Sequence, residues 1–141
     1  MADKKPGGKP TLDQRRAEHA WKAVCGVVDK YARDKGKAKK FGGQARKLPT
    51  RIIASGLGQA LAFLKAKDYA PDLLVELGDW VLDKRGQAAS SKAKPKDDEL
   101  LLAVVRGNSD FLRRATDEVL AYLLWLNRFA EAEKITEEEG D

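Results

Sequence analysis

The side chains that could take part in acid–base or nucleophilic chemistry are few in this sequence. It contains one histidine, His19, and one cysteine, Cys25. They are six residues apart in a segment with helical periodicity, which places them about 120° apart around the helix axis, so a Cys–His pair is not expected. We interpret Cys25 as a small buried apolar residue and His19 as a solvent-facing or border residue of this helix.

Patterns that hold a metal, a cofactor or a phosphate group are not found in the sequence either. No group of His, Cys and acidic residues has the spacing of metal ligands. The acids Asp97, Asp98 and Glu99 are an ordinary complement to the N-terminus of a helix. The glycines at 42–43 do not form a phosphate-binding loop, because no strand precedes them and no Gly-Lys-Ser/Thr follows. The sequence therefore predicts no catalytic residue, no metal, no cofactor and no small-molecule substrate.

The distribution of charge suggests binding instead. The chain of 141 residues has a net charge of +5. Between Lys30 and Arg51, nine basic residues occur with a single acid, Asp34, whereas the segment from Glu131 onward is strongly acidic. Clustered cations without counter-acids are typical of surfaces that contact the phosphate backbone of nucleic acids. Solvated basic loops with no partner would have the same composition.

The expected location is the cytoplasm, without a membrane partner. The longest uninterrupted apolar run, Val119–Leu126, is far shorter than the ~20 residues that a membrane-spanning helix needs. The first ten residues lack the apolar stretch of a secretory signal. A single cysteine excludes an internal disulfide and fits a reducing compartment.

Apolar residues recur at three- and four-residue intervals, and no segment alternates with the period of a strand. We predict an all-α fold, a compact bundle of about five helices with a long C-terminal helix. The helices are expected at about 12–35, 49–65, 71–85, 99–106 and 111–132. Residues 1–10 are predicted to be a disordered arm, 11–133 a single helical domain and 134–141 an acidic disordered tail.

Glycine and proline positions set several of these boundaries. Gly42 and Gly43 are expected to separate the first two helices, and Pro49 to lie in the first turn of the second. If the second helix instead begins near Gln44, a kink at Pro49 is expected. Gly56 and Gly58 lower helix propensity by roughly 1 kcal/mol each. We expect a close backbone approach by a neighbouring helix as the reason for their presence.

The last predicted helix is apolar on more than one side. Leu120 borders its charged face, and Leu124 lies in the middle of that face. A helix that is apolar nearly all round needs partners on several sides. Those partners are either other helices of this chain or another subunit, so Leu120 and Leu124 are candidate subunit-interface residues.

Three sequence segments are specific in combination, although each alone could occur in other helical proteins. They are RRAEHAWKAV at 15–24, ARKLPTRIIASGLGQALAFLKAK at 45–67 and SDFLRRATDEVLAYLLWLNRFAEAE at 109–133. Together they resemble the small helical subunit of the Cmr complex, the type III-B CRISPR RNA-silencing effector. The resemblance implies a non-catalytic protein whose copies stack in the minor filament of the complex and line the channel for the guide–target duplex. The implied partners are other Cmr subunits, further copies of this chain, crRNA and target RNA.

Residue roles follow only in part from this resemblance. By charge rather than by motif, we expect five residues to face the RNA backbone: Lys39, Lys40, Arg46, Lys47 and Arg51. The residues of the shared segments that we assign to folding are Trp21, Leu48, Pro49, Leu57, Phe63, Leu64, Trp125 and Phe129. Two alternatives stay open, a free-standing helical nucleic-acid-binding protein and a ribonuclease that uses His19.

Overall fold

Helices follow one another along the residues that the computed structural model describes, which are 8–84 and 93–136, with the backbone alone for 83 and 84. The helices are α1 (Leu12–Lys30), α2 (Lys35–Ser55), α3 (Leu57–Lys67), α4 (Pro71–Gly78), the π-helix η1 (Asp79–Lys84), α5 (Glu99–Arg106) and α6 (Ser109–Ala132). No strand occurs in these two ranges, so the all-α prediction with a long C-terminal helix is confirmed. Within them, no helix has the length and apolar character needed to cross a membrane.

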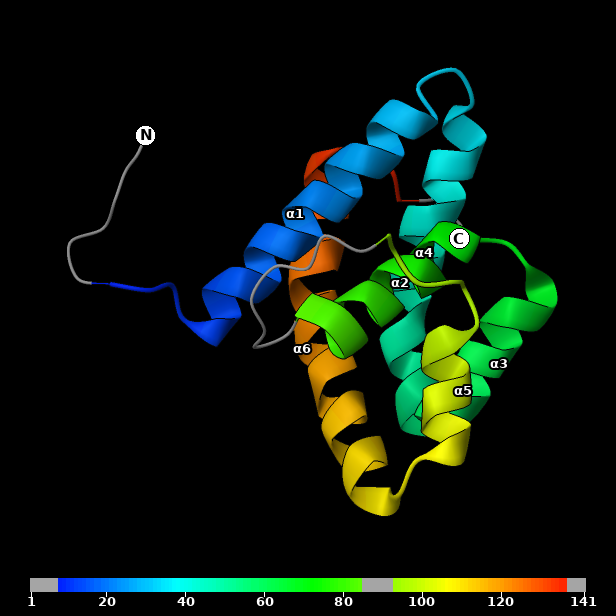
Figure 1. Ribbon diagram of the computed structural model, residues 1–141. Helices are drawn as coiled ribbons and strands as arrows, with labels where there is room; N and C mark the ends of the chain where they lie inside the picture. The colour runs from blue at the N-terminus through cyan, green and yellow to red at the C-terminus, as the bar shows by residue number, and fades with distance from the viewer. Residues whose placement is uncertain (1–7, 85–92, 137–141) are drawn as a thin grey trace.

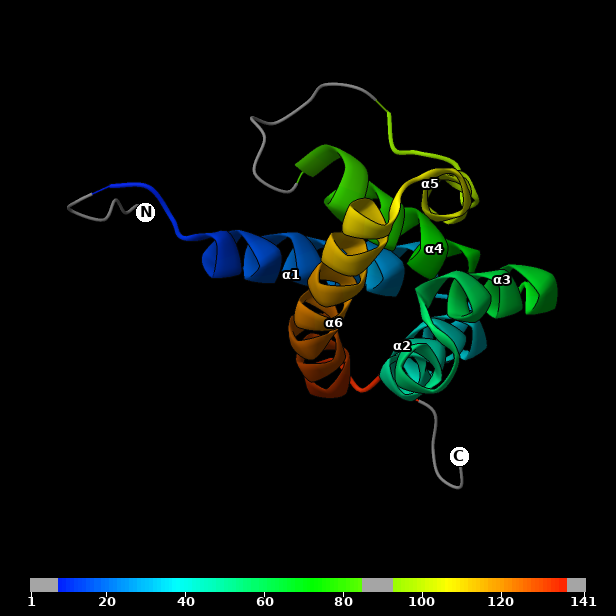
Figure 2. The same ribbon diagram turned by 90° about the horizontal axis from the view of Figure 1, so that it is seen from below.

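The helix α6 is the element against which the others are arranged. It contacts α1, α2, α5 and η1. In Figure 1, α1 crosses α6 on one side of the fold, and α2, α3 and α5 lie on the other. The view in Figure 2 shows α4 between these two groups. The largest fully buried side chains come from most of the helices: Phe41, Leu48, Leu57, Leu61, Leu64, Leu73, Leu77, Trp80, Leu100, Tyr122, Leu123 and Leu126.

Local capping interactions start the first and last helices. The Thr11 hydroxyl accepts from the Gln14 amide at 3.0 Å, and the Gln14 side chain accepts from the Thr11 amide at 2.8 Å. Thr11 and Gln14 therefore form a capping box. At α6, the Asn108 side chain accepts from the Phe111 amide at 2.9 Å. Both helix starts are therefore explained by residues three positions apart.

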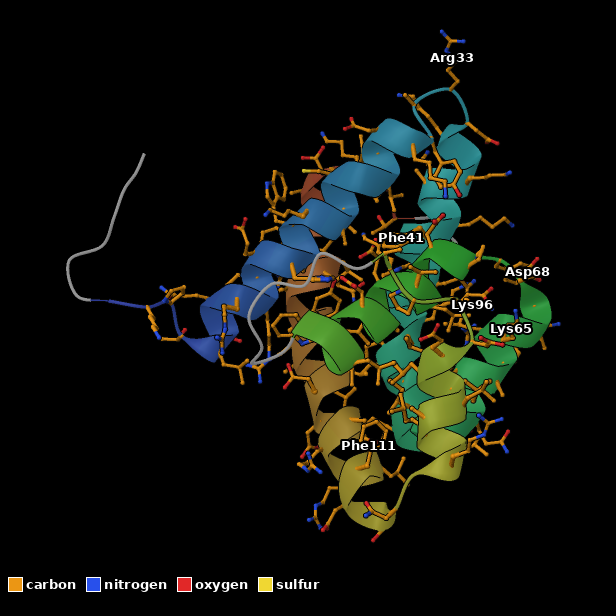
Figure 3. All side chains as sticks on the ribbon, viewed as in Figure 1. Arg33, Phe41, Lys65, Asp68, Lys96 and Phe111 are labelled. Carbon is orange, nitrogen blue, oxygen red and sulfur yellow. The ribbon has the colours of Figure 1, made fainter. Side chains whose placement is uncertain are left out.

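The helix α2 differs most from the sequence expectation. Gly42 and Gly43 were expected to separate the first two helices, whereas α2 continues through them without interruption. A Cβ atom at Gly42 would lie 2.8 Å from the carbonyl carbon of Ile135 and closer still to its oxygen. The glycine is needed because the segment after α6 packs directly on the α2 backbone. In Figure 3, Phe41, the neighbour of Gly42, points into the fold, whereas Arg33 points away from it.

The expectation for Pro49 is also wrong, because this residue lies inside α2 rather than in a first turn. A proline in a helix cannot donate to the carbonyl four residues earlier, which here belongs to Ala45. The side-chain amide of Asn127, on α6, donates to that carbonyl at 3.0 Å. The partner helix therefore replaces the hydrogen bond that Pro49 cannot make.

The expected close approach at Gly56 and Gly58 is not observed. Gly56 separates α2 from α3 and has a φ of +89°, where a Cβ would meet nothing within 4 Å. A Cβ at Gly58 would lie 3.6 Å from Val104, an ordinary van der Waals distance. Gly56 is thus required by its backbone conformation, which side chains rarely adopt.

Two of the residues assigned to folding lie at the edge of the core. Trp21 and Phe63 are each 39% exposed. Trp21 packs against Phe129 with 5.2 Å between the ring centroids, on the outer side of the contact between α1 and α6. Cys25 is half-buried rather than buried, and its partial burial raises the pKa of the thiol.

The described chain extends beyond the last helix into the range predicted as a tail. Ile135 is buried in the core, and its amide donates to the Ala130 carbonyl at 3.0 Å. Residues 1–7 of the predicted arm and 137–141 of the predicted tail lie outside the described residues. Their disorder stays a prediction.

Candidate nucleic-acid interface

The continuity of α2 places all five predicted RNA-binding residues on one helix. At 100° per residue they cover an arc of about 140°. The opposite side of α2 packs into the core through Ala38, Phe41, Ala45, Leu48 and Ile52. Lys40 and Arg46 are exposed, and Lys39, Lys47 and Arg51 are half-buried. The helix α2 contains no acidic residue. We call its outer side, which carries these five basic residues, the cationic face.

Arg51 makes two side-chain contacts that join parts of the fold. Its guanidinium donates to the side-chain oxygen of the buried Gln44 at 2.7 Å. The same group lies 4.5 Å from the ring centroid of Phe63 on α3, a distance typical of a cation–π contact. Replacing Arg51 would therefore disturb the α2–α3 junction as well as the charge of the face.

An open hollow of about 550 Å³ lies at the start of α2, between the end of α1 and the connection from α3 to α4. Lys40 of the cationic face lines it, with its ammonium 4.9 Å from the ring centroid of the exposed Tyr69. A cation beside an exposed aromatic ring is suited to a phosphate and its adjacent base. The hollow adjoins the cationic face, and its lining is mixed in charge, with Lys37 and Lys40 beside Asp34, Asp68 and Asp72.

The acidic residue Asp72 on the wall of this hollow is already engaged. It accepts from Lys30 at 2.9 Å and from the Tyr31 hydroxyl at 2.5 Å. The hydrogen bond to Asp72 and burial raise the pKa of Tyr31. The carboxylate thus fixes the end of α1 against the start of α4.

The candidate interface residue Leu124 is 75% exposed, so the other helices of this chain do not cover it. Leu120 is partly buried and packs against the core. Both line a shallow groove of about 320 Å³ between α6 and Pro49 of α2, with Arg128 and Glu131 at its edge. Leu124 is the more exposed of the two leucines.

Sequence reasoning missed a buried polar cluster between α1, α4, η1 and α6. His19 is not solvent-facing: its side chain is 12% exposed. One ring nitrogen, Nε2, lies 2.7 Å from an Asp79 carboxylate oxygen, and the other, Nδ1, lies 2.7 Å from the Tyr122 hydroxyl. The histidine therefore links three helical elements from inside the fold.

A second part of this cluster is built on Glu118 of α6. Arg16 binds the Glu118 carboxylate with two nitrogens, Nε at 2.5 Å and Nη2 at 3.0 Å. The indole N–H of Trp80 donates to the same carboxylate at 2.7 Å. The hydrogen bond to Glu118 raises the pKa of Arg16. The spacing of Arg114 and Glu118 suggests a surface ion pair on one helix, yet the Glu118 carboxylate points inward.

The helical spacing contained a signal for this cluster. Arg16 precedes the buried Ala20 by four residues, and His19 precedes the buried Ala23 by four residues. Glu118 lies at the same kind of interval between the buried Ala115 and Tyr122 on α6. Polar residues within an apolar stripe indicate buried pairs, because an unpaired buried charge is strongly unfavourable.

A family model described as CRISPR-associated protein (Cas_Cmr5) matches residues 12–133. The chain belongs to the CRISPR-associated Cmr5 family. A crystal structure of a CRISPR-associated Cmr5 family protein from Thermus thermophilus has the same fold, with a TM-score of 0.68 and 29% sequence identity. The match covers 91% of this chain and 100% of the Thermus chain. The resemblance to a subunit of the type III-B Cmr complex is thereby confirmed.

The region matched to the Cmr5 family contains the cationic face, Leu124 and the polar cluster. It extends from the first residue of α1 to the residue after α6. The cationic face, the exposed Leu124 and the polar cluster are therefore features of the Cmr5 domain itself and not of its terminal segments.

Proposed function

We propose that this protein is a non-catalytic structural subunit that stacks in the minor filament of the Cmr complex and helps to hold the crRNA–target RNA duplex in the cytoplasm. The observation that carries the proposal is the cationic face of α2, which has no acidic residue among the 21 residues of the helix. Phosphate contacts need only such a surface and do not depend on base sequence. The exposed Leu124 supplies a contact for a neighbouring subunit.

The state of His19 supports a non-catalytic role over the ribonuclease alternative. Both of its ring nitrogens are within hydrogen-bond distance of Tyr122 or Asp79. A general base must reach the proton that it abstracts from the substrate. A largely buried imidazole with both nitrogens engaged does not reach an RNA strand on the surface.

Removing four cations of the face is expected to weaken target-RNA capture by the reconstituted Cmr complex. The variant carries Lys39→Ala, Lys40→Ala, Arg46→Ala and Lys47→Ala, and leaves Arg51 in place because of its contacts with Gln44 and Phe63. Each lost phosphate contact reduces the slope of log affinity against log salt by about 0.7 to 0.9. The measurement is target-RNA affinity at several salt concentrations.

A matched control removes the same charge from other helices. It carries Lys22→Ala, Arg106→Ala, Arg113→Ala and Arg114→Ala, at exposed positions of α1, α5 and α6. We expect the control complex to keep the wild-type slope. Unchanged capture by the α2 variant over the salt series, or an equal loss in the control, would contradict RNA contact by the cationic face. Tight salt-sensitive binding by the isolated protein would favour the free-standing nucleic-acid-binding alternative.

The substitution Leu124→Asp is expected to reduce incorporation into the Cmr complex by tenfold or more, roughly the effect of losing a central interface contact. Leu124 is exposed in the isolated chain, so its replacement changes the free energy of unfolding by no more than about 0.5 kcal/mol. Copurification with the other Cmr subunits measures incorporation. Val105→Asp on α5 is the control, because Val105 is a similarly exposed apolar residue at 67%. Equal incorporation of the two variants would exclude Leu124 from the interface.

A further inference from the structure

We propose that His19, Glu76 and Asp79 form a binding site for one divalent transition-metal ion such as Zn²⁺. One potential ligand atom of each residue lies within 4.8 Å of the other two. Imidazole nitrogen and carboxylate oxygen are the donor atoms that Zn²⁺ accepts in proteins besides thiolate. This inference does not depend on the proposed RNA contact.

The three residues are positioned by elements that are packed together. His19 lies on α1, Glu76 near the end of α4, and Asp79 at the first position of η1. Residues three positions apart on a helix share one side, so Glu76 and Asp79 both face α1. The chain changes from α-helix to π-helix directly at Asp79, and such π-helical segments are frequent at functional sites.

An unpartnered atom points to a missing ligand at this place. Glu76 is 8% exposed, and one of its carboxylate oxygens, Oε1, is buried with no hydrogen-bond partner. The other oxygen, Oε2, accepts from Lys94 at 2.6 Å. A buried carboxylate oxygen without a partner is unfavourable. A bound cation would give this oxygen a partner.

The charges of the cluster also leave room for a divalent ion. Three buried carboxylates, those of Glu76, Asp79 and Glu118, lie in the cluster. Arg16 pairs with Glu118 and Lys94 pairs with Glu76, while Asp79 is paired only to His19 in the described part of the chain. A divalent ion bound to a neutral histidine would displace Lys94. The ion and Arg16 together would then balance the negative charges of the three carboxylates. Buried charges are stable only when they are balanced in this way.

The surroundings of His19 favour metal binding through Nε2. Its Nδ1 lies 2.7 Å from the fully buried Tyr122 hydroxyl. The hydroxyl oxygen of Tyr122 can accept a hydrogen bond from Nδ1–H. A second hydrogen bond that orients the ring is the usual support of a metal-binding histidine.

The donor set selects the class of metal. Mg²⁺ and Ca²⁺ prefer sites made of oxygen atoms alone, and an imidazole ligand disfavours both. One nitrogen and two carboxylate oxygens, with a water as the fourth ligand, suit tetrahedral Zn²⁺ and its spectroscopic substitute Co²⁺. We therefore expect Zn²⁺ to bind and Mg²⁺ not to compete.

The test is a titration of the full-length protein with Zn²⁺ by calorimetry and with Co²⁺ by visible absorption. The expected result is one ion per chain, with a tetrahedral Co²⁺ spectrum that lacks a thiolate charge-transfer band, because Cys25 is not in the site. His19 is the only histidine, so its ¹⁵N resonances report on the site alone. Zn²⁺ is expected to shift the Nε2 resonance and to leave Nδ1 protonated.

Four variants make this test specific. Glu76→Gln and Asp79→Asn are expected to weaken Zn²⁺ binding by more than about tenfold, since even the loss of a supporting contact has an effect of that size. Lys94→Gln is expected to tighten binding, because it removes the ammonium that competes for Glu76. Glu18→Gln, an exposed acid next to His19 on α1, is the control and should bind as the wild type does.

Several outcomes would overturn the proposal. They are the absence of saturable binding at one ion per chain, equal binding by Glu76→Gln and the wild type, and a Zn²⁺-insensitive Nε2 resonance. If Asp79→Asn does not fold, as judged by circular dichroism, the wild-type resonance and the Glu76→Gln and Lys94→Gln titrations decide the question.

Discussion

The substitution Arg16→Met is expected to lower the free energy of unfolding by about 3 kcal/mol or more. Glu118 would keep the hydrogen bond from Trp80 but would lose its bidentate partner in the interior. Its side chain is only 7% exposed, so water cannot replace the guanidinium. Methionine fills most of the volume of the arginine stem, and the loss is therefore mainly electrostatic. Urea unfolding followed by circular dichroism and by tryptophan fluorescence measures the change.

A control and a double-mutant cycle separate the buried pair from a general loss of charge. Arg113 pairs with Asp110 at 3.1 Å on the exposed side of α6, and Arg113→Met should change the free energy of unfolding by at most about 1 kcal/mol. Adding Glu118→Gln to Arg16→Met should recover part of the lost stability, because the amide oxygen can still accept from Trp80 without a buried charge. A loss below about 1 kcal/mol for Arg16→Met would show that the pair contributes little to folding.

The substitution Gly42→Ala is expected to destabilise the protein by about 1 to 3 kcal/mol, the usual range for overpacking a well-packed site. The added methyl group would meet the Ile135 carbonyl, and backbone atoms cannot move aside as a flexible side chain can. The segment after α6 would have to detach from α2, exposing Ile135. Urea unfolding measures the stability, and hydrogen exchange of the Ile135 amide, bonded to the Ala130 carbonyl, measures the detachment.

Gly26→Ala is the matched control, and its expected effect has the opposite sign. Gly26 also lies inside a helix, α1, but a Cβ there would meet nothing within 4 Å. Alanine should therefore stabilise the protein by about 0.5 to 1 kcal/mol through its helix propensity. Equal effects of the two substitutions would show that the contact between Gly42 and Ile135 is not important for folding.

Features governed by neighbours in the sequence could be predicted well. The capping box joins Thr11 to Gln14, and the cap of α6 joins Asn108 to Phe111. Helical periodicity predicted α1, α5 and α6, because each of these helices contains apolar residues at three- and four-residue intervals. The basic segment was also evident, since a count of local charges needs no tertiary information.

Features governed by distant residues could not be predicted in this way. His19 and Tyr122 are 103 positions apart, and His19 and Asp79 are 60 positions apart. The spacing of a polar residue within an apolar stripe can indicate that it is buried, but it does not show with which distant residue it pairs. The partners became evident only when α1, η1 and α6 were packed together, and their pairing compensates for the loss of water.

The amino-acid sequence alone determined that this chain forms helices, where most of them begin, and that one segment carries a large excess of positive charge. Tertiary structure decided that this charge lies on one helical face. Gly42 and Pro49 are normally signals that end a helix, but they act here within α2. Gly42 leaves space for the Ile135 backbone, and Asn127, 82 positions from Ala45, supplies the hydrogen bond that Pro49 lacks. These contacts with distant residues outweighed the low helix propensity of glycine and proline. The Ile135 backbone fills the space beside Gly42, and Asn127 bonds the carbonyl that Pro49 cannot reach.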